Sequence, residues 1–414
     1  MNIKNYKCIG CGSKNIKVVV NFGEFPIATT YSNYADEKVK KNKLGLSICA
    51  NCNLIQNSDP VNPIDVYNNS YDYITGASST HKKYLKSRAN DYIKKFNLDV
   101  DSNVLEVASN DGLFQDIMRE NGIKLVGIEP SEVPANMAIE KGHDVVIDFF
   151  NSNLVKKLNL SKMFDIVIMN NVITHTDNPV DMLSSAKECL FDNGIIVLEC
   201  MYLGDQLDNN SFETIYHGNY TYLSLSSIFT FSNMAGIEVV GAEKINSHGS
   251  SIRVWMKKNN TIKNSNFPQL QLLKIQEEEE NLGYGHLPTL LEKINDLELV
   301  ISKFISNFKK FVKQENDFGR IVVGYGAAAK TATYISILGK DSQGIKFVCD
   351  MNKNKWGKYF PGTNIEILDP RVLRNADYTI IVFPWNLLPE IKKQLKVENL
   401  TGRVISIKEI IEGV

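Results

Sequence analysis

The stretch from Val104 to Glu129 constrains the fold more than any other part of the chain. A short apolar run ends on Glu106, a turn of small residues follows, and a helical pattern begins at Gly112. A second apolar run, 124–128, then ends on the acid Glu129. Strand, small turn, helix, strand and terminal acid form the unit with which a doubly wound sheet binds a nucleoside, the carboxylate lying on the ribose. The sequence therefore predicts an α/β fold with a nucleoside site after the first strand of this unit.

The residues of the turn distinguish between two kinds of nucleoside cofactor. In place of Gly-x-Gly-x-x-Gly, the turn reads Glu106-x-Ala108-x-Asn110-x-Gly112. A dinucleotide needs glycines there because its pyrophosphate lies directly on the backbone, whereas a sulfonium ligand carries no pyrophosphate. The turn therefore favours S-adenosylmethionine as the cofactor.

Four of the 7 cysteines form two Cys-x-x-Cys pairs, Cys8/Cys11 and Cys49/Cys52. In a reducing compartment such pairs indicate a metal rather than disulfides. Two residues between the thiolates let both sulfurs face one ion, and two such turns complete a tetrahedral zinc site. With four thiolates and no open position, the zinc is expected to be structural. The other three cysteines stand singly in apolar runs and are expected in the core: Cys189, Cys200 and Cys349.

A length of 414 residues is too great for one hydrophobic core, and the sequence pattern divides the chain into three parts. Residues 1–75 have few long apolar segments, so zinc is expected to replace a core in this N-terminal lobe. Residues 76–260 carry the alternating strands and helices of the doubly wound sheet. A long amphipathic helix at about 290–312 then leads into a second, smaller α/β unit within residues 261–414.

The charge balance argues against two classes of partner. Lys+Arg of 46 against Asp+Glu of 47 leaves a formal net charge of -1, which gives no support for nucleic acid or an anionic membrane. The acidic run 276–280 is expected to be the solvated face of a helix. The first residues lack the apolar run of a signal peptide, and no later stretch is long enough to span a bilayer. We therefore expect a cytoplasmic, monomeric protein with a small-molecule substrate.

Short motifs, taken in order along the chain, indicate a family. The motifs are the two Cys-x-x-Cys pairs, Pro26-Ile-Ala28, Glu106–Gly112, Gly127–Pro130, Asp148–Phe150, Asn170–Val172 with His175, Ile215–His217, His248-Gly249 before Arg253, Tyr325–Lys330, Gly357–Thr363 and Pro384–Asn386. Their number and their order across three regions of the chain make chance similarity improbable. Nearly end to end, the chain resembles the deoxysugar C-methyltransferases, which alkylate nucleotide-linked keto-sugars in antibiotic and surface-glycan pathways.

The resemblance implies a zinc-bearing lobe, a central Rossmann-like class I methyltransferase domain, and a smaller Rossmann-like domain that holds the nucleotide diphosphate of the sugar. The active site would lie in the cleft between the lobes. Glu129 can bind both ribose hydroxyls, while Asp148 accepts from the adenine amino group and Phe149 covers the ring. An aromatic loop ahead of the first cofactor strand can close over the methyl donor. The expected cofactor-binding residues are Tyr71, Tyr73, Glu106, Ala108, Asn110, Gly112, Glu129, Pro130, Asp148, Phe149, Asn170 and Asn171.

A second glycine turn, Gly324-x-Gly326, opens the C-terminal unit, and Lys330-Thr331 follows it. A lysine and backbone N–H groups at a helix start suit the diphosphate of a sugar nucleotide. The competing class is an NAD-dependent oxidoreductase with Asp350 on the ribose, but the third glycine of its fingerprint is absent. The expected substrate-binding residues are Asn219, His248, Gly326, Ala328, Lys330, Thr331, Asp350 and Asn386.

One family motif is broken. Methyl transfer to carbon needs a base that removes a proton beside a ketone, and donors that stabilise the enolate oxygen. In the family, the last two residues of a Tyr-His-Glu-His motif are thought to be the proton-abstracting pair, but this chain reads Tyr216-His-Gly-Asn219. Gly218 has no side chain, and the amide of Asn219 cannot accept a proton.

Three interpretations of the broken motif stay open. The base has moved, with His217 the first choice because its ordinary pKa lies near neutrality; or the acceptor is a hydroxyl or amine, whose proton can leave late; or the protein only binds its ligands. The catalytic candidates are His217, Tyr222, His175 and Tyr216.

Overall fold

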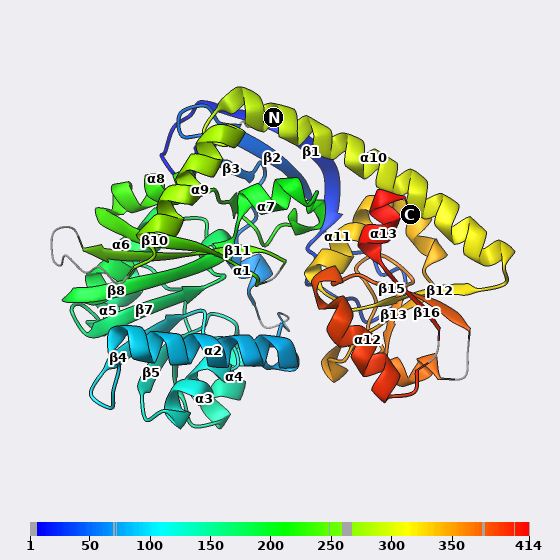
Figure 1. Cartoon of the computed structure of the whole chain (residues 1–414). Helices are drawn as coiled ribbons and strands as arrows, with labels where there is room; N and C mark the ends of the chain where they lie inside the picture. The colour runs from blue at the N-terminus through cyan, green and yellow to red at the C-terminus, as the bar shows by residue number, and fades with distance from the viewer. Residues whose placement is uncertain are drawn as a thin grey trace.

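Three β-sheets organise the described residues in the computed structural model. The structure describes residues 6–68, 71, 73–247, 249–258, 267–374, 377–400 and 402–413. Figure 1 shows a large sheet and a smaller one beside each other, with a long helix, α10, running along the top of the molecule towards the smaller one. Within these residues, no helix has the length and apolar character needed to cross a membrane.

The N-terminal sheet is antiparallel and has the order β1-β2-β3-β9. Its strands are β1 (Ile16–Pro26), β2 (Lys41–Cys49), β3 (Ile55–Asn57) and β9 (Thr221–Tyr222). The last strand comes from far along the chain, directly after the Tyr216–Asn219 motif. The N-terminal lobe is therefore completed by the segment that carries the broken motif. A short helix, α1 (Pro63–Val66), follows β3 and is capped by the side chain of Asn62.

The central sheet has the order β10-β11-β8-β7-β4-β5-β6. Its strands are β4 (Asn103–Val107), β5 (Lys124–Ile128), β6 (Asp144–Val146), β7 (Phe164–Asn170), β8 (Leu190–Met201), β10 (Ile237–Ile245) and β11 (Ser251–Lys258). The first five are parallel, and β10 and β11 form an antiparallel hairpin at one edge. Residues 166–169 of β7 are at most 1% exposed, as expected for a strand covered on both faces. The predicted doubly wound sheet is confirmed.

Helices cover both faces of this sheet. They are α2 (Ser79–Phe96), α3 (Leu113–Glu120), α4 (Glu132–Glu140), α5 (Ser152–Leu158), α6 (Pro179–Cys189), α7 (Leu203–Asp208) and α8 (Leu225–Ala235), with 3₁₀ turns η1 (Thr75–Ala77), η2 (Ile173–His175) and η3 (Phe212–Thr214). The side chain of Ser78 caps α2 by accepting the His81 N–H. Asn97, with a left-handed φ of 50°, ends the same helix.

Two helices, α9 (Gln269–Leu282) and α10 (Leu287–Asp317), connect the central sheet to the C-terminal one. The apolar residues of α10 recur on one stripe and are buried: Leu290, Ile294, Leu297, Phe304 and Phe308. The expectation of a solvated acidic face on α9 is wrong for Glu279, which is 2% exposed. Its carboxylate accepts the backbone N–H groups of Leu225 and Ser226, and so caps the start of α8.

The C-terminal sheet is wholly parallel and has the order β14-β13-β12-β15-β16. Its strands are β12 (Ile321–Tyr325), β13 (Phe347–Cys349), β14 (Glu366–Leu368), β15 (Tyr378–Val382) and β16 (Arg403–Ser406). Its helices are α11 (Ala329–Leu338), α12 (Leu388–Val397) and α13 (Ile407–Glu412), with 3₁₀ turns η4 (Gly339–Gly344), η5 (Lys353–Lys355), η6 (Pro370–Leu373) and η7 (Trp385–Leu387). Counted from its first strand, the order is 3-2-1-4-5, which the central sheet shares.

The hydrophobic interior contains the three single cysteines, as predicted, each 0% exposed: Cys189, Cys200 and Cys349. The N-terminal lobe is also attached to the C-terminal sheet. Ser32 forms a β-bridge with Tyr359, and the Asp36 N–H donates to the Thr363 carbonyl at 2.9 Å. The first residues of the chain therefore contact both larger units.

Candidate active site

The turn between β4 and α3 lies at the switch point of the central sheet, where β4 and β7 are neighbours and their crossovers diverge. Ala108, Asn110 and Gly112 have left-handed φ values of 60°, 51° and 74°. A Cβ atom at position 112 would lie 2.9 Å from the Cβ of Ala138 on α4. Glycine is required there by both its φ angle and the close packing of the two helices.

Glu129, at the end of β5, is fixed against this turn. It is 3% exposed, and its carboxylate accepts the N–H groups of Asn110 at 3.0 Å and Ser131 at 2.8 Å. Burial raises the pKa of the carboxyl group, although these two hydrogen bonds oppose the rise. Each oxygen retains a lone pair, so the carboxylate can still accept from two ribose hydroxyls.

Buried acceptors gather at the same edge of the sheet. The carboxylate and amide oxygens here that are buried without a hydrogen-bond partner among the described residues include Glu106 Oε2, Asp111 Oδ1, Asn170 Oδ1 and Asn171 Oδ1. The pKa of Glu106 is raised well above its ordinary value, mainly by burial and further by the nearby carboxylates of Asp111 and Glu129. A ligand with a sulfonium and an ammonium group supplies the positive charge and donors that this edge lacks. The edge therefore fits S-adenosylmethionine.

The aromatic loop before α2, which contains Tyr71 and Tyr73, is hydrogen-bonded to the turn at this edge of the sheet. The side-chain amide of Asn110 donates to the Tyr73 carbonyl at 3.0 Å, and its oxygen accepts the Thr75 N–H at 2.8 Å. A Cβ atom on Gly76 would lie 2.6 Å from Asp111 Oδ2, so the loop follows the turn closely. Tyr71 packs on Tyr67, with ring centroids 5.1 Å apart.

Asp148 and Phe149 follow β6 and are half-buried. The Asp148 carboxylate accepts the Phe149 N–H at 2.8 Å and lies 3.6 Å from the Lys157 ammonium group. Pro130 directly follows Glu129 and precedes Ser131, whose N–H group donates to that carboxylate. The structure thus gathers the predicted cofactor residues along one edge of the sheet.

His175, in the turn after β7, lies among aromatic side chains. Its Nδ1 donates to the Gly218 carbonyl at 2.7 Å, and the Tyr67 hydroxyl donates to the same oxygen at 2.8 Å. The rings of His175 and Tyr67 meet edge to face, with centroids 5.7 Å apart. Burial lowers the pKa of His175, and the hydrogen bond to Gly218 opposes this shift. The histidine is therefore neutral at physiological pH.

The other three catalytic candidates are placed differently. His217 is 1% exposed, and its Nε2 donates to the β2 carbonyls of Asn42 and Lys43, both at 3.2 Å. Tyr222 lies in β9, and its hydroxyl is buried without a partner among the described residues. Tyr216 is half-buried. These three lie on one segment, whereas His175 reaches that segment from the switch point.

Asn219 and His248 were expected at the substrate. Asn219 is 0% exposed, and its amide donates to the Thr214 carbonyl at 2.7 Å, so it holds the segment together. His248 lies outside the described residues. Its neighbour Gly249 has a φ of 93°, and a Cβ atom there would lie 3.0 Å from the ring of Trp385 in the C-terminal unit.

The turn after β12 has one left-handed residue, Gly326, with a φ of 94°. A Cβ atom there would lie 2.5 Å from Pro384, which follows β15. The Asp350 carboxylate, after β13, accepts the N–H groups of Ala327 at 2.6 Å and Asn352 at 2.8 Å. The Ala327 carbonyl in turn accepts the buried Lys355 ammonium group at 2.7 Å. The turn is therefore rigid before any ligand binds.

Cations and one buried acid line the start of α11. Ala328 caps the helix, the Thr331 hydroxyl donates to the Gly326 carbonyl, and Lys330 stands in the first turn. Burial lowers the pKa of Lys330, and the negative charge of Glu213 opposes the shift. Glu213 is 0% exposed and accepts the Trp385 indole N–H at 3.0 Å.

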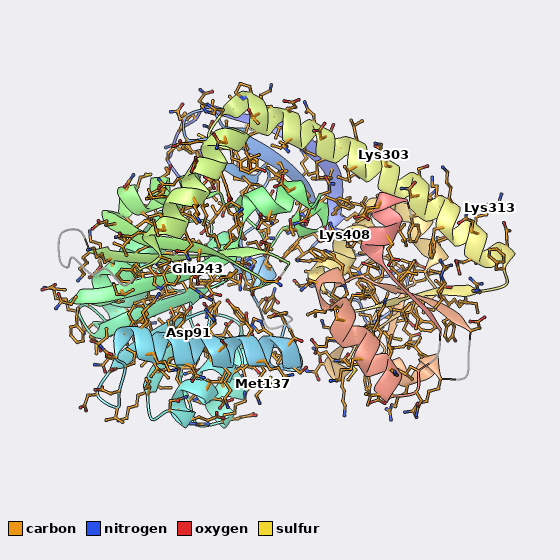
Figure 2. All side chains as sticks on the ribbon, viewed as in Figure 1. Asp91, Met137, Glu243, Lys303, Lys313 and Lys408 are labelled. Atoms are coloured by element: carbon orange, nitrogen blue, oxygen red, sulfur yellow. The ribbon has the colours of Figure 1, made fainter. Side chains whose placement is uncertain are left out.

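Lys408 adds a further cation between the two units. Its ammonium group lies 5.0 Å from the centre of the Trp385 ring and donates to the Asn209 carbonyl. Figure 2 labels Lys408 where the C-terminal unit faces the central one. The loop containing Trp385 and Asn386 also meets the Gly249 turn. The second glycine turn therefore opens towards the central sheet.

Sequence reasoning missed several of these residues. Tyr67, Glu213, Lys355 and Lys408 are single polar residues in unremarkable sequence, and only the tertiary fold brings them to the site. Trp385 stood within a quoted motif, but nothing in the sequence paired it with a buried carboxylate.

The four paired cysteines converge. All their sulfur atoms lie within 4.8 Å of one another. Each Cys-x-x-Cys turn closes with the same bond, from the Gly12 N–H to the Cys8 carbonyl at 2.9 Å and from the Asn53 N–H to the Cys49 carbonyl at 2.8 Å. Gly12 and Asn53 are both left-handed, with φ of 72° and 57°. Two matched turns with four sulfurs fit a tetrahedral metal.

Comparison with known proteins identifies two domains in the chain. Residues 81–241 match the model of a methyltransferase domain, and residues 246–407 match that of a C-methyltransferase C-terminal domain. The C-methyltransferase NovU from Streptomyces niveus is 25% identical over 390 residues, which are 93% of this chain and 91% of NovU. A tRNA U34 carboxymethyltransferase from Campylobacter jejuni is 26% identical over 165 residues, 37% of this chain and 56% of that protein. A solved methyltransferase from Archaeoglobus fulgidus shares 16% identity with a TM-score of 0.35, covering 43% of this chain and 94% of that protein.

The doubly wound sheet, its acceptor-rich edge and these matches define an S-adenosylmethionine-dependent methyltransferase. The two matched domains follow one another along the chain, and the alignment with NovU spans nearly the whole chain. Along nearly its whole length the chain is similar to a C-methyltransferase, and residues 246–407 match the C-methyltransferase C-terminal domain.

Proposed function

We propose that the protein methylates a carbon atom beside the ketone of a nucleotide-diphosphate-linked deoxysugar, with a 4-keto-6-deoxy sugar as the favoured substrate. The observation that carries the proposal is the pairing of two nucleotide-type turns in one chain, one rich in acceptors and one bearing cations. An alignment with a C-methyltransferase over 93% of the chain supports the same assignment. A cytoplasmic location remains part of the proposal.

S-adenosylmethionine supplies an electrophilic methyl group when it is bound. Glu129 binds the ribose, Asp148 and Phe149 bind and cover the adenine, and the free oxygens of Asn170 and Asn171 accept from the methionine end. The loop at Tyr71 and Tyr73 borders this side of the site. These residues hold and orient the cofactor, and the chemistry on the acceptor falls to other groups.

The sugar nucleotide is proposed to lie on the turn after β12. The first N–H groups of α11, the Lys330 ammonium group and the Thr331 hydroxyl form an anion site for the diphosphate. Asp350, at the end of the neighbouring strand, is placed for the ribose of the nucleotide. Since this turn faces the central sheet, the sugar would extend towards the methyl donor.

Zinc is proposed on Cys8, Cys11, Cys49 and Cys52, with a structural role. Four thiolates leave no open position for a substrate or water. The site ties the first residues of the chain to β2 and the turn after it, and thus to the sheet that β9 completes.

The missing Glu-His pair keeps a second candidate function open, namely methyl transfer to a hydroxyl or amine of a nucleotide sugar. Such an acceptor loses its proton late and needs less help from a base. The oxidoreductase alternative loses its support because both matched domains are methyltransferase domains.

The test is incubation with methyl-labelled S-adenosylmethionine and a panel of nucleotide-linked keto, hydroxy and amino sugars. NMR then locates the label. A label on the carbon next to the ketone supports the proposal, whereas a label on oxygen or nitrogen establishes the second candidate. Absence of transfer to every sugar in the panel would contradict both.

A further inference from the structure

The space beside Gly218 is filled by a residue from another segment. A Cβ atom at position 218 would lie 3.0 Å from the Tyr216 ring and 3.2 Å from the Tyr67 hydroxyl. Both distances are tighter than ordinary carbon contacts. A side chain at 218 would require the Tyr216 ring and the Tyr67 hydroxyl to shift. Tyr67 and Tyr216 therefore border the position from which a glutamate side chain would extend.

The Gly218 carbonyl determines which nitrogen of His175 is basic. A carbonyl oxygen only accepts hydrogen bonds, so Nδ1, which is 2.7 Å away, carries the proton. In the neutral ring the lone pair then lies on Nε2. A second bond, from the Tyr220 N–H to the Thr174 carbonyl at 2.8 Å, fixes the backbone on both sides of this contact. His175 is thus held in one tautomer and one orientation.

His217 has the opposite arrangement. Its Nε2 carries the proton because it donates to the Asn42 and Lys43 carbonyls, and its basic Nδ1 is buried without a partner among the described residues. The ring is 1% exposed and faces the N-terminal sheet. His175 is half-buried instead, and it lies five residues after Asn170 at the switch point of the cofactor sheet. His175 therefore retains some exposure beside the cofactor sheet, whereas His217 is almost fully buried against the N-terminal sheet.

We propose that His175 Nε2 is the general base of this enzyme, and that the Gly218 carbonyl and Tyr67 position it in place of the lost Glu-His pair. The inference rests on the proposed carbon methylation. Nε2 takes the proton beside the ketone, the C–H electron pair forms the carbon–carbon double bond of an enolate, and the carbonyl π pair moves onto oxygen. The enolate carbon receives the methyl group as it leaves the sulfonium sulfur, which keeps the electrons of the broken bond. The proton on Nε2 then passes to solvent.

The test measures proton abstraction alone. A nucleoside-diphosphate 4-keto-6-deoxyhexose is incubated with enzyme in D₂O without S-adenosylmethionine, and NMR follows deuterium entering the carbon beside the ketone. His175→Asn keeps an amide donor where Nδ1 was, so the bond to Gly218 can persist while the base is lost. Exchange is expected to fall by about 10²- to 10⁴-fold, as for removal of a general base. The melting temperature and S-adenosylhomocysteine affinity should be unchanged, which shows that the variant is folded.

Two further variants separate the roles. His286→Asn changes an exposed histidine at the start of α10 and is the matched control, with exchange equal to wild type. Tyr67→Phe removes one hydrogen bond from the positioning group, so exchange should fall by about threefold to tenfold with an unchanged KM for the sugar nucleotide.

The outcomes distinguish this inference from the function on which it rests. Wild-type exchange that survives in His175→Asn overturns the inference alone, and loss of exchange in His217→Gln, which keeps its donor to β2, would then assign the base to His217. Wild type that exchanges no proton of any keto-sugar, and methylates oxygen or nitrogen, overturns the carbon assignment and the base together.

Discussion

The turns after β4 and β12 share one hydrogen-bonded frame, formed by an acid and two backbone N–H groups, but the side chains around the two frames differ in charge. In each, an acid at the end of the neighbouring strand accepts one N–H from the turn and a second from two residues beyond itself. Glu129 accepts from Asn110 and Ser131 at 3.0 and 2.8 Å. Asp350 accepts the corresponding pair of N–H groups at 2.6 and 2.8 Å. Both sheets also share the order 3-2-1-4-5, so the resemblance is one of topology as well as local geometry.

The difference lies in what surrounds each frame. The first turn is bordered by unpaired buried oxygens and by Glu106, whose pKa is raised by burial. The second has Lys330 at the helix start and Lys355 on the turn carbonyl. A cationic ligand suits the first edge and an anionic one the second. The fold determines where a ligand binds, and the side chains around the turn determine whether that ligand is a cation or an anion.

The largest effect is expected from breaking the zinc site, because the N-terminal lobe is bonded to both turns. Tyr31, from the N-terminal lobe, donates to the Ala327 carbonyl of the second turn at 2.8 Å. Cys49→Ser should release the metal and unfold the lobe, because structural zinc contributes about 10–16 kcal/mol of apparent binding free energy. Elemental analysis should find no zinc, and binding of both the sugar nucleotide and S-adenosylhomocysteine should weaken. A zinc-free wild-type protein would refute the site.

Removing the cation of the second turn is expected to have the next largest effect. Lys330→Met keeps the apolar stem and removes the charge, at a cost of about 1.5–3 kcal/mol in sugar-nucleotide binding, or roughly tenfold to a hundredfold in Kd. Calorimetry with S-adenosylhomocysteine should show no change. Lys340→Met, at an exposed lysine beyond α11, is the control. Loss of cofactor affinity in Lys330→Met would mean that the two turns do not divide the ligands as proposed.

The paired acids allow a reciprocal test of smaller size. Glu129→Ala should weaken S-adenosylhomocysteine binding by about 1–3 kcal/mol, because ribose donors and two backbone N–H groups lose an acceptor. Asp350→Ala should have the same effect on the sugar nucleotide only. If both substitutions weaken binding of the same ligand, the two turns resemble each other in structure but do not bind different ligands.

The sequence was sufficient for the elements whose pattern is local. The apolar run that ends on Glu106, the run at 124–128 and the cysteine pairs all follow from periodicity or spacing. Glu279 shows the limit, because its run of acids reads as solvated and only the tertiary fold brings α8 to it. The same holds for Tyr67 and Gly218, 151 residues apart in sequence. No single-sequence pattern records a hydrogen bond across such a separation.

The smallest expected effect is a pair of opposite pH dependences. Burial lowers the pKa of Lys330, and the groups that face it are Glu213, which opposes the shift, and Lys408. Its charge is therefore lost at a lower pH than that of an ordinary lysine, so sugar-nucleotide affinity should fall as pH rises. Burial raises the pKa of Glu106, so this carboxyl group gains its negative charge at a higher pH than an ordinary glutamate, and affinity for a cationic cofactor should increase as pH rises. One proton is involved at each site, which limits both slopes to tenfold per pH unit. Calorimetry across pH 6 to 9 measures both affinities. Lys330→Met should remove the pH dependence of sugar-nucleotide binding only, and Glu106→Gln that of cofactor binding only. Two pH dependences of the same sign would contradict the division of charge between the two turns.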